Sequence, residues 1–195
     1  MPKKYSQSER ENIRKDLIRQ AERCLYYKGI CGTSVDELVR AVRIPKGTFY
    51  LFYPSKEDLF FDVLHSFRLE MQDGMLSLLQ ELDENHIVTS LTTVFFHLLK
   101  NVYERGIYRL LDEQEMMVIS RKSEEDIYKR ELGQLLDFFK ELFSYFAIDD
   151  KDDIAAFSDA FLLIVYSMPC GVRMKEPLSA WKLLLRGLVL QLVGE

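Results

Sequence analysis

Cysteine, proline and glycine are scarce in this sequence, with 3, 5 and 9 copies among 195 residues. Cys24, Cys31 and Cys170 form no C-x-x-C pair, and their odd number leaves one cysteine over in any disulfide scheme. This usage is typical of proteins in a reducing cytoplasm, where we expect the chain to be located. The few glycines and prolines leave long stretches without helix breakers, which favours helices.

Long apolar runs are also lacking. No segment of the sequence has the roughly 18 uninterrupted apolar residues that a membrane-spanning helix needs. The N-terminal sequence Met-Pro-Lys-Lys-Tyr-Ser-Gln leads directly into charged residues, without the apolar stretch of a signal peptide. We therefore expect no membrane partner. The chain is 48% hydrophobic, so it can still bury a substantial core.

The sequence also lacks metal-binding and catalytic patterns. His65, His86 and His97 are scattered, and none has a second ligand at a spacing typical of metal sites. There is no Gly-rich phosphate loop, nucleophile elbow or Cys/His catalytic pattern. Carboxylate pairs such as Glu113 and Glu115 are typical of the solvated face of an amphipathic helix. We therefore predict no metal, no cofactor and no enzymatic activity.

Charge is distributed unevenly, although the chain as a whole carries a net charge of −5. Residues 1–56 contain 12 Lys and Arg against 6 Asp and Glu, which is a net charge of +6. The remaining residues contain 14 against 25, a net charge of −11. A basic head on an acidic body indicates a nucleic-acid partner. A solvated helix whose charges happen to cluster would give the same count.

Apolar residues recur at three- and four-residue steps through most of the chain, as they do at Ile13, Leu17 and Ala21. This period predicts an all-α fold. The expected helices cover residues 8–28, 34–41, 45–53 and 55–82, followed by 87–105, 107–120, 123–147, 152–170 and 177–193.

Local signals at the start of the chain predict short helices joined by tight turns. Gly29 ends the first helix, and Ser34 with Glu37 has the spacing of a capping box at the start of the second. Pro45 suits the first turn of the third helix, because proline lacks the N–H that would be unpaired there. With the turn Arg43-Ile44-Pro45 between them, the second and third helices form a predicted helix-turn-helix. In that motif the second of the paired helices enters the major groove of DNA.

The third helix carries residue types that suit contact with DNA. Lys46 supplies a positive charge near its start, and Gly47 lets the main chain approach a phosphate closely. Thr48 and Tyr50 offer hydroxyl groups. Phe49 is expected to point inward as a hydrophobic anchor.

Three blocks of residues in this region resemble the TetR family of repressors. They are Thr33-Ser34-Val35, Lys46-Gly47-Thr48-Phe49-Tyr50 and Pro54-Ser55-Lys56-Glu57-Asp58-Leu59. The resemblance covers about residues 10 to 62. It implies an all-helical homodimer with a three-helix DNA-binding head, residues 1–54, and a larger helical body, residues 55–195, for ligand binding and dimerisation. The implied partners are double-stranded operator DNA, a small-molecule effector and a second copy of the chain.

The resemblance also implies which residues contact DNA. Phosphate contacts are expected at Arg14, Ser34, Lys46, Tyr50 and Lys56, and bases are within reach of Arg43, Thr48 and Leu51. The complete set of predicted DNA-binding residues is Arg14, Thr33, Ser34, Arg43, Lys46, Gly47, Thr48, Tyr50, Leu51, Tyr53 and Lys56.

The sequence departs from the family pattern around the turn. Val42 and Arg43 stand where the family usually has a small residue and a glycine, and Pro45 stands where it often has Ser or Thr. Phe52 replaces a common His or Tyr, so a polar phosphate contact is lost there or moves to Tyr53. Arginine is the side chain best shaped to bind guanine through two hydrogen bonds, which makes Arg43 a candidate base contact. It is otherwise a solvent-facing turn residue.

The body is rich in aromatic residues and methionine, as a pocket for an apolar or aromatic effector is expected to be. Most of these side chains must form the core. The candidate pocket residues are Phe96, Tyr103, Met117 and Phe139.

The last two expected helices are apolar on more than one face. They form either the centre of the body or a four-helix interface across a two-fold axis, and the resemblance favours the interface. Trp181 is an interface anchor or a core residue. The candidate interface residues are Phe161, Val165, Trp181, Leu184 and Leu188.

Taken together, the residues and the resemblance predict a DNA-binding regulator, a repressor released by its effector. A helical protein that sequesters a ligand or a partner, with a head that no longer binds DNA, is the alternative. The unusual turn at Val42-Arg43 is the observation behind that alternative.

Overall fold

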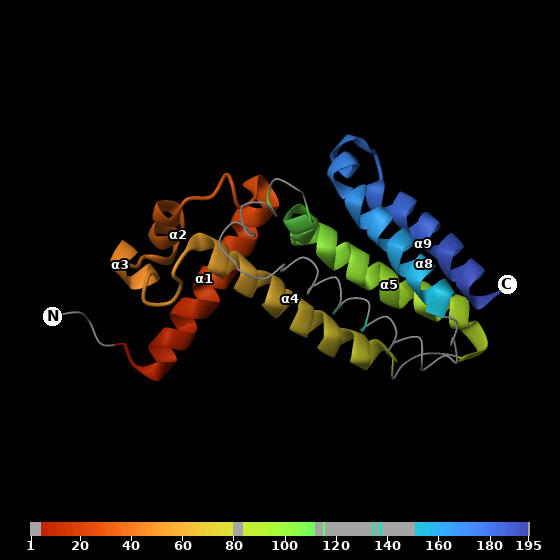
Figure 1. Cartoon of the computed structure of the whole chain (residues 1–195), viewed down its shortest axis with the longest axis horizontal. Coiled ribbons are helices and arrows are strands. Elements are labelled where there is room, and N and C mark those ends of the chain that lie inside the picture. The colour runs from red at the N-terminus through yellow and green to blue at the C-terminus, as the bar shows by residue number, and fades with distance from the viewer. Residues whose placement is uncertain are drawn as a thin grey trace. The chain divides into compact units, whose positions relative to one another are not determined.

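Figure 1 shows a computed structural model of the chain, which describes residues 5–79, 84–111, 115, 134, 137 and 151–194. Every regular element in these ranges is a helix, which confirms the all-α fold. The chain divides into two compact units. The head unit contains residues 1–70 and 104–122, and the body unit contains residues 71–103 and 123–195. The functional boundary placed after residue 54 stays a prediction.

The first helix, α1 (Gln7–Lys28), begins one residue before the predicted start at residue 8, and Ser6 is its N-cap. Ser6 forms a reciprocal capping box with Glu9: Glu9 N–H donates to Ser6 Oγ over 3.2 Å, and Ser6 N–H donates to Glu9 Oε2 over 2.8 Å. The helix ends at Gly29 as predicted, with a φ of 73° that favours glycine. Leu17 and Leu25 on its inner face are fully buried.

Helix α2 (Val35–Val42) has Ser34 as its N-cap, where Ser34 Oγ accepts a hydrogen bond of 3.2 Å from Glu37 N–H. The helix ends at Arg43, which has a φ of 60° and a ψ of 43°. Arg43 is the one non-glycine residue with positive φ in the described ranges. A side chain in this left-handed conformation costs about 1–2 kcal/mol. In return the turn closes tightly, because Ile44 N–H donates to Val39 O over 3.0 Å.

Helix α3 (Lys46–Phe49) follows Pro45 directly and is shorter than the predicted helix, which extended to residue 53. Beyond Phe49 the chain continues in tight turns, in which Leu51 N–H donates to Thr48 O and Phe52 N–H to Phe49 O. Helix α4 (Lys56–Leu79) then begins behind Ser55, whose Oγ accepts from Asp58 N–H over 3.2 Å.

The core of the head unit contains side chains from more than its first three helices. Fully buried side chains come from α1, α2, α3 and the first turns of α4, and Leu110 of the short helix η2 (Ile107–Leu111) is equally buried. Helix η2 packs against α1. Between α5 and η2 lies Gly106, a predicted helix break, with a φ of 72°. A Cβ at residue 106 would lie 2.5 Å from Tyr26 Cα, so only glycine allows this close approach.

The described part of the body unit contains α5 (Ile87–Glu104), preceded by η1 (Glu84–His86), and α8 (Lys151–Tyr166), η3 (Met168–Arg173) and α9 (Pro177–Val193). Figure 1 shows α8 and α9 side by side, and the two helices are in contact. Phe95 of α5 packs on Phe157 and Phe161 of α8, with ring centroids 4.9 and 6.1 Å apart. No helix in the described ranges is both long and apolar enough to cross a bilayer.

The close approach at Gly106 leads to a stability prediction. Gly106→Ala should lower the free energy of unfolding by about 2 kcal/mol or more, because the new Cβ meets the α1 backbone in a left-handed conformation. The matched control is Gly74→Ala in α4, where a Cβ meets no atom within 4 Å. That substitution should leave stability unchanged or raise it by about 0.5–1 kcal/mol. Urea unfolding of the two variants checks the prediction, and equal effects would contradict it.

Candidate nucleic-acid interface

The exposed face of the helix-turn-helix is formed by α2, the turn and α3. Ser34, Arg43, Lys46 and Gly47 are all exposed. Immediately after α3, Tyr50 and Leu51 remain 51% and 57% exposed although both are large side chains. Seven of the predicted DNA-binding residues are therefore at the surface: Arg14 on α1, and Ser34, Arg43, Lys46, Gly47, Tyr50 and Leu51 on this face.

Lys46 is held across the motif by α2. Its Nζ lies 3.0 Å from the Asp36 carboxylate, and both side chains are exposed. This hydrogen bond raises the pKa of Lys46. Exposed ion pairs contribute little to stability, so a DNA phosphate can take the place of Asp36 as the partner of Lys46 with little loss of stability.

Arg14 of α1 belongs to a polar cluster that joins three helical segments. Its Nε and Nη2 both lie 2.9 Å from Asp62 Oδ2 on α4. The same oxygen accepts a hydrogen bond of 2.6 Å from the Tyr53 hydroxyl. Burial, followed by the hydrogen bond to Asp62, raises the pKa of Tyr53. Tyr53 is 4% exposed, so it supports Arg14 from within the head and its hydroxyl is already occupied.

The two predicted threonines are buried. Thr33 is 2% exposed, and its Oγ1 donates to Gly29 O over 2.6 Å. Thr48 is 7% exposed, and its Oγ1 lies 3.3 Å from the Tyr5 hydroxyl. Thr33 thus holds the α1–α2 loop, and Thr48 joins α3 to the segment before α1. Phe49 is fully buried as predicted.

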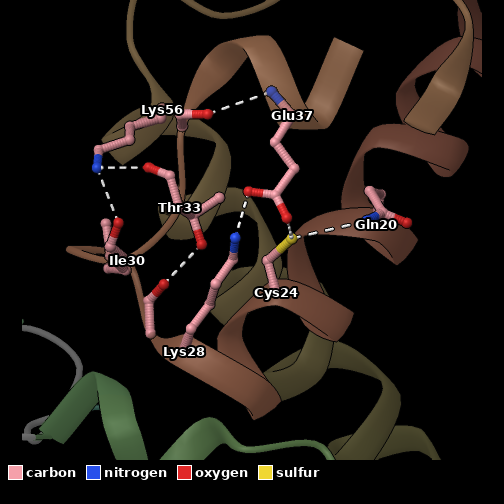
Figure 2. Close-up of polar contacts among 9 residues, drawn as sticks. Gln20, Cys24, Lys28, Ile30, Thr33, Glu37 and Lys56 are labelled. Carbon is pink, nitrogen blue, oxygen red and sulfur yellow. Dashed lines mark hydrogen bonds and ion pairs between the residues drawn. The ribbon is translucent and has the colours of Figure 1, made fainter. Parts of the chain in front are cut away.

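Lys56 lies on the inner side of the α1–α2 loop, as Figure 2 shows. Its Nζ donates to Ile30 O and to Thr33 O, each over 2.8 Å. The ammonium group that was predicted to meet a phosphate is thus half-buried and bound to the main chain. Its first role in the structure is to fix the loop from which α2 starts.

A carboxylate binds the same loop through its amide groups. Glu115 Oε2 accepts from Ile30 N–H over 2.7 Å and from Cys31 N–H over 3.0 Å. Glu115 Oε1 lies where a Cβ at residue 29 would be, so a side chain at that position would displace the carboxylate. We call Lys56 and Glu115 the loop clamp. Sequence analysis interpreted Glu115 as part of a solvated helix face and missed this contact.

Further ionic contacts tie the ends of α1 to its neighbours. Lys28 pairs with Glu37 of α2, next to the thiol of Cys24, which is 4.0 Å from Glu37 Oε1 (Figure 2). Burial raises the pKa of the Cys24 thiol. Arg105 pairs with Glu22 of α1 and, over 2.7 Å, with Glu70 of α4. No motif in the sequence predicted these pairs, because their partners are far apart along the chain.

The predicted effector residues lie on α5 and in ranges outside the described residues. Phe96 is half-buried, with Lys182 Nζ 5.1 Å from its ring centroid. Tyr103 is also half-buried and packs edge-on against Trp181, with 4.9 Å between ring centroids. Met117 and Phe139 lie outside the described residues. A pocket lined by these residues stays a prediction.

The predicted interface residues divide into two groups. Phe161, Val165 and Trp181 are at most 3% exposed, so they belong to the core of a single chain. Trp181 Nε1 donates to Ser167 Oγ over 2.9 Å, which satisfies its polar group within the chain. Leu184 is 57% exposed and Leu188 half-buried, so both can meet another surface.

Residues 17–63, which extend from α1 into α4, match the family model of bacterial regulatory proteins of the tetR family. The N-terminal head of this chain is thus similar to the TetR family. The helix-turn-helix of this TetR head is α2 and α3, and Arg43 occupies the turn between them.

Individual transcriptional regulators are also similar to this chain. The HTH-type transcriptional repressor DhaR of Mycobacterium sp. (strain GP1) is 29% identical over 72 residues, or 37% of this chain. The chain matches only 36% of the length of that relative. Two solved structures share the whole fold. A TetR-like transcriptional regulator from Rhodococcus sp. RHA1 is 19% identical, with a TM-score of 0.58 over 98% of this chain and 100% of that one. The fatty acid degradation regulator FadR from Bacillus halodurans is 14% identical, with a TM-score of 0.65 over 96% and 97%.

The loop clamp predicts that loss of the Lys56 ammonium group destabilises the protein more than loss of an exposed ammonium group does. Lys56→Met should lower the free energy of unfolding by about 1–3 kcal/mol, because Thr33 O loses the donor Lys56 and Ile30 O keeps only the bond from Thr33 N–H. Lys46→Met, on the exposed face, should change it by no more than about 0.5 kcal/mol. Urea unfolding monitored by circular dichroism measures both values. A loss at Lys46 as large as that at Lys56 would refute the clamp.

Proposed function

We propose that this protein is a cytoplasmic transcriptional repressor that binds palindromic operator DNA as a homodimer and is released by a small apolar or aromatic effector. The observation that carries the proposal is the exposed face of a TetR helix-turn-helix, with Lys46, Tyr50 and Leu51 on or just after its second helix. In this motif the second helix lies in the major groove. Lys46 and Tyr50 then meet phosphates, and Leu51 meets base edges or methyl groups.

The dimer is supported by apolar side chains that a single chain leaves exposed. Leu163 and Tyr166 at the end of α8 are 69% and 42% exposed, and Leu183 and Leu184 of α9 are 74% and 57% exposed. Helices α8 and α9 are neighbours, so both can contribute to one surface. Exposed apolar surface of this kind is stabilised by burial against another copy. We place the two-fold interface on these side chains, with Leu188 at its edge.

Effector control is supported by the way in which the chain passes between its two units. Helix α4 begins in the head unit and ends in the body unit, and the chain returns to the head unit at residue 104. An effector in the body that displaces either connection alters the position of the head. A coupling of about 1–3 kcal/mol between the two sites, typical of allosteric proteins, is sufficient for control. The return segment carries Arg105 and Glu115, which hold α1 and the α1–α2 loop.

DNA binding is tested with fluorescent duplexes from the region upstream of the protein's own gene. The full-length protein should bind them with an affinity that falls at least about 100-fold between roughly 50 and 200 mM salt, because phosphate contacts release counterions. Tyr50→Ala should weaken binding while leaving thermal stability unchanged, since Tyr50 is exposed. If the protein binds a small apolar ligand but shows no salt-sensitive binding to duplex DNA, the result supports a ligand-sequestering protein instead.

The interface is tested by charge insertion. Leu183→Glu combined with Leu184→Glu should convert a dimer into a monomer in analytical ultracentrifugation, because burying two carboxylates in an apolar contact is unfavourable. Operator affinity should fall with it, since a monomer engages only one half-site. Leu69→Glu on α4, at a leucine that is 46% exposed, is the matched control and should remain dimeric. A double variant that stays dimeric would remove α9 from the interface.

A further inference from the structure

We propose that Arg43 determines operator specificity by donating two hydrogen bonds to a guanine from the turn between α2 and α3. This inference rests on the proposed function, since it requires the helix-turn-helix to enter the major groove. It assigns a specific base contact to a residue that lies outside the second helix of the motif.

The turn requires the backbone of residue 43 but not its side chain. Arg43 adopts a φ of 60°, and its N–H donates to Arg40 O and Val39 O at the end of α2. The next amide, Ile44 N–H, closes the turn on Val39 O over 3.0 Å. Glycine forms this turn without any steric penalty, and it is the usual residue at such positions. An arginine here must therefore be explained by its guanidinium group.

The guanidinium of Arg43 is not used within the described part of the chain. The residue is exposed, and no hydrogen bond, ion pair or ring contact joins its side chain to another described residue. Exposed Arg40 of α2 is likewise without such a contact to a described residue, but several other basic side chains of the head unit do have such partners. These residues and their partners are Arg14 with Asp62, Lys28 with Glu37, Lys46 with Asp36, and Lys56 with the carbonyls of Ile30 and Thr33. No side-chain contact of Arg43 with another described residue therefore offsets the strain of its backbone conformation.

The location of the turn matches contact with bases. Arg43 precedes Lys46, the first residue of α3, by three positions. In a helix-turn-helix the N-terminal residues of the second helix contact base edges. Arginine presents a planar pair of donors that fits O6 and N7 of guanine, and this is the commonest specific contact in the major groove. A contact with a backbone phosphate would require only the charge, which lysine also supplies.

The experiment selects bound duplexes from a pool with a fully randomised core, using the full-length protein and the variants Arg43→Gly and Arg43→Lys. The wild-type pool should be enriched in guanine at one symmetric pair of positions. Arg43→Gly should lose that guanine and keep the remaining preferences, whereas Arg43→Lys should retain the guanine in weakened form, because an ammonium group can still donate to O6 and N7. Affinity of Arg43→Gly for the wild-type consensus duplex should fall about tenfold or more. Its melting temperature should stay the same or rise by about 2 °C, because glycine relieves the strain.

The matched control is Arg40→Ala, which removes the same charge from an exposed position one turn earlier in α2. It should leave the enriched guanine in place. If Arg43→Gly retains every base preference, the proposal is refuted. If the variant weakens binding to all duplexes equally and lowers the salt slope by about one, Arg43 is a phosphate contact and the proposal is again refuted. If the wild-type protein selects no duplex, the proposed function fails as well, which distinguishes the two results.

Discussion

The position of α2 depends on how the α1–α2 loop is held. The amide and carbonyl groups of such a loop need hydrogen-bond partners, and here both types of group are bound by charged side chains. Lys56 binds two carbonyls and Glu115 binds two amides of residues 30–33. Charge-assisted hydrogen bonds are stronger than neutral ones, so the clamp fixes the start of α2 and, through the following turn, α3. The surface that we propose to meet DNA is therefore oriented by groups that lie behind it.

The fold was predictable because its signals are local. The apolar period, the cap at Ser34 and the breaks at Gly29 and Gly106 placed most helix ends within a few residues. Helix α3 was overestimated, because Leu51 and Phe52 N–H donate three residues back, and only Tyr53 N–H keeps the i→i−4 bond of an α-helix. The left-handed conformation of residue 43 was not predicted, and the sequence showed only an arginine where the family usually has glycine. Its actual geometry required coordinates.

The candidate site was only partly predictable, for a different reason. Residue type and position identified Lys46, Tyr50 and Leu51 on the surface. The same reasoning could not show that Lys56 and Tyr53 bind partners inside the head. Ile30, whose carbonyl binds Lys56, is far from it in the sequence, and Asp62, which binds Tyr53, looks like any other polar residue of a helix. Glu115 is 85 residues from Ile30 in the chain, and no local pattern records such a contact. Long-range hydrogen bonds, unlike helix periods, leave no signature in a single sequence.

The head unit is discontinuous, and this restricts how its parts can be exchanged between proteins. A hybrid joined after residue 54 would inherit α1–α3 from one parent and Arg105, Leu110 and Glu115 from the other. The interior of such a head would combine side chains that never evolved together. Recombination within the family is therefore expected to succeed when the segment around residues 104–115 travels with the N-terminal helices. Regions outside these two pieces are free to diverge toward other effectors.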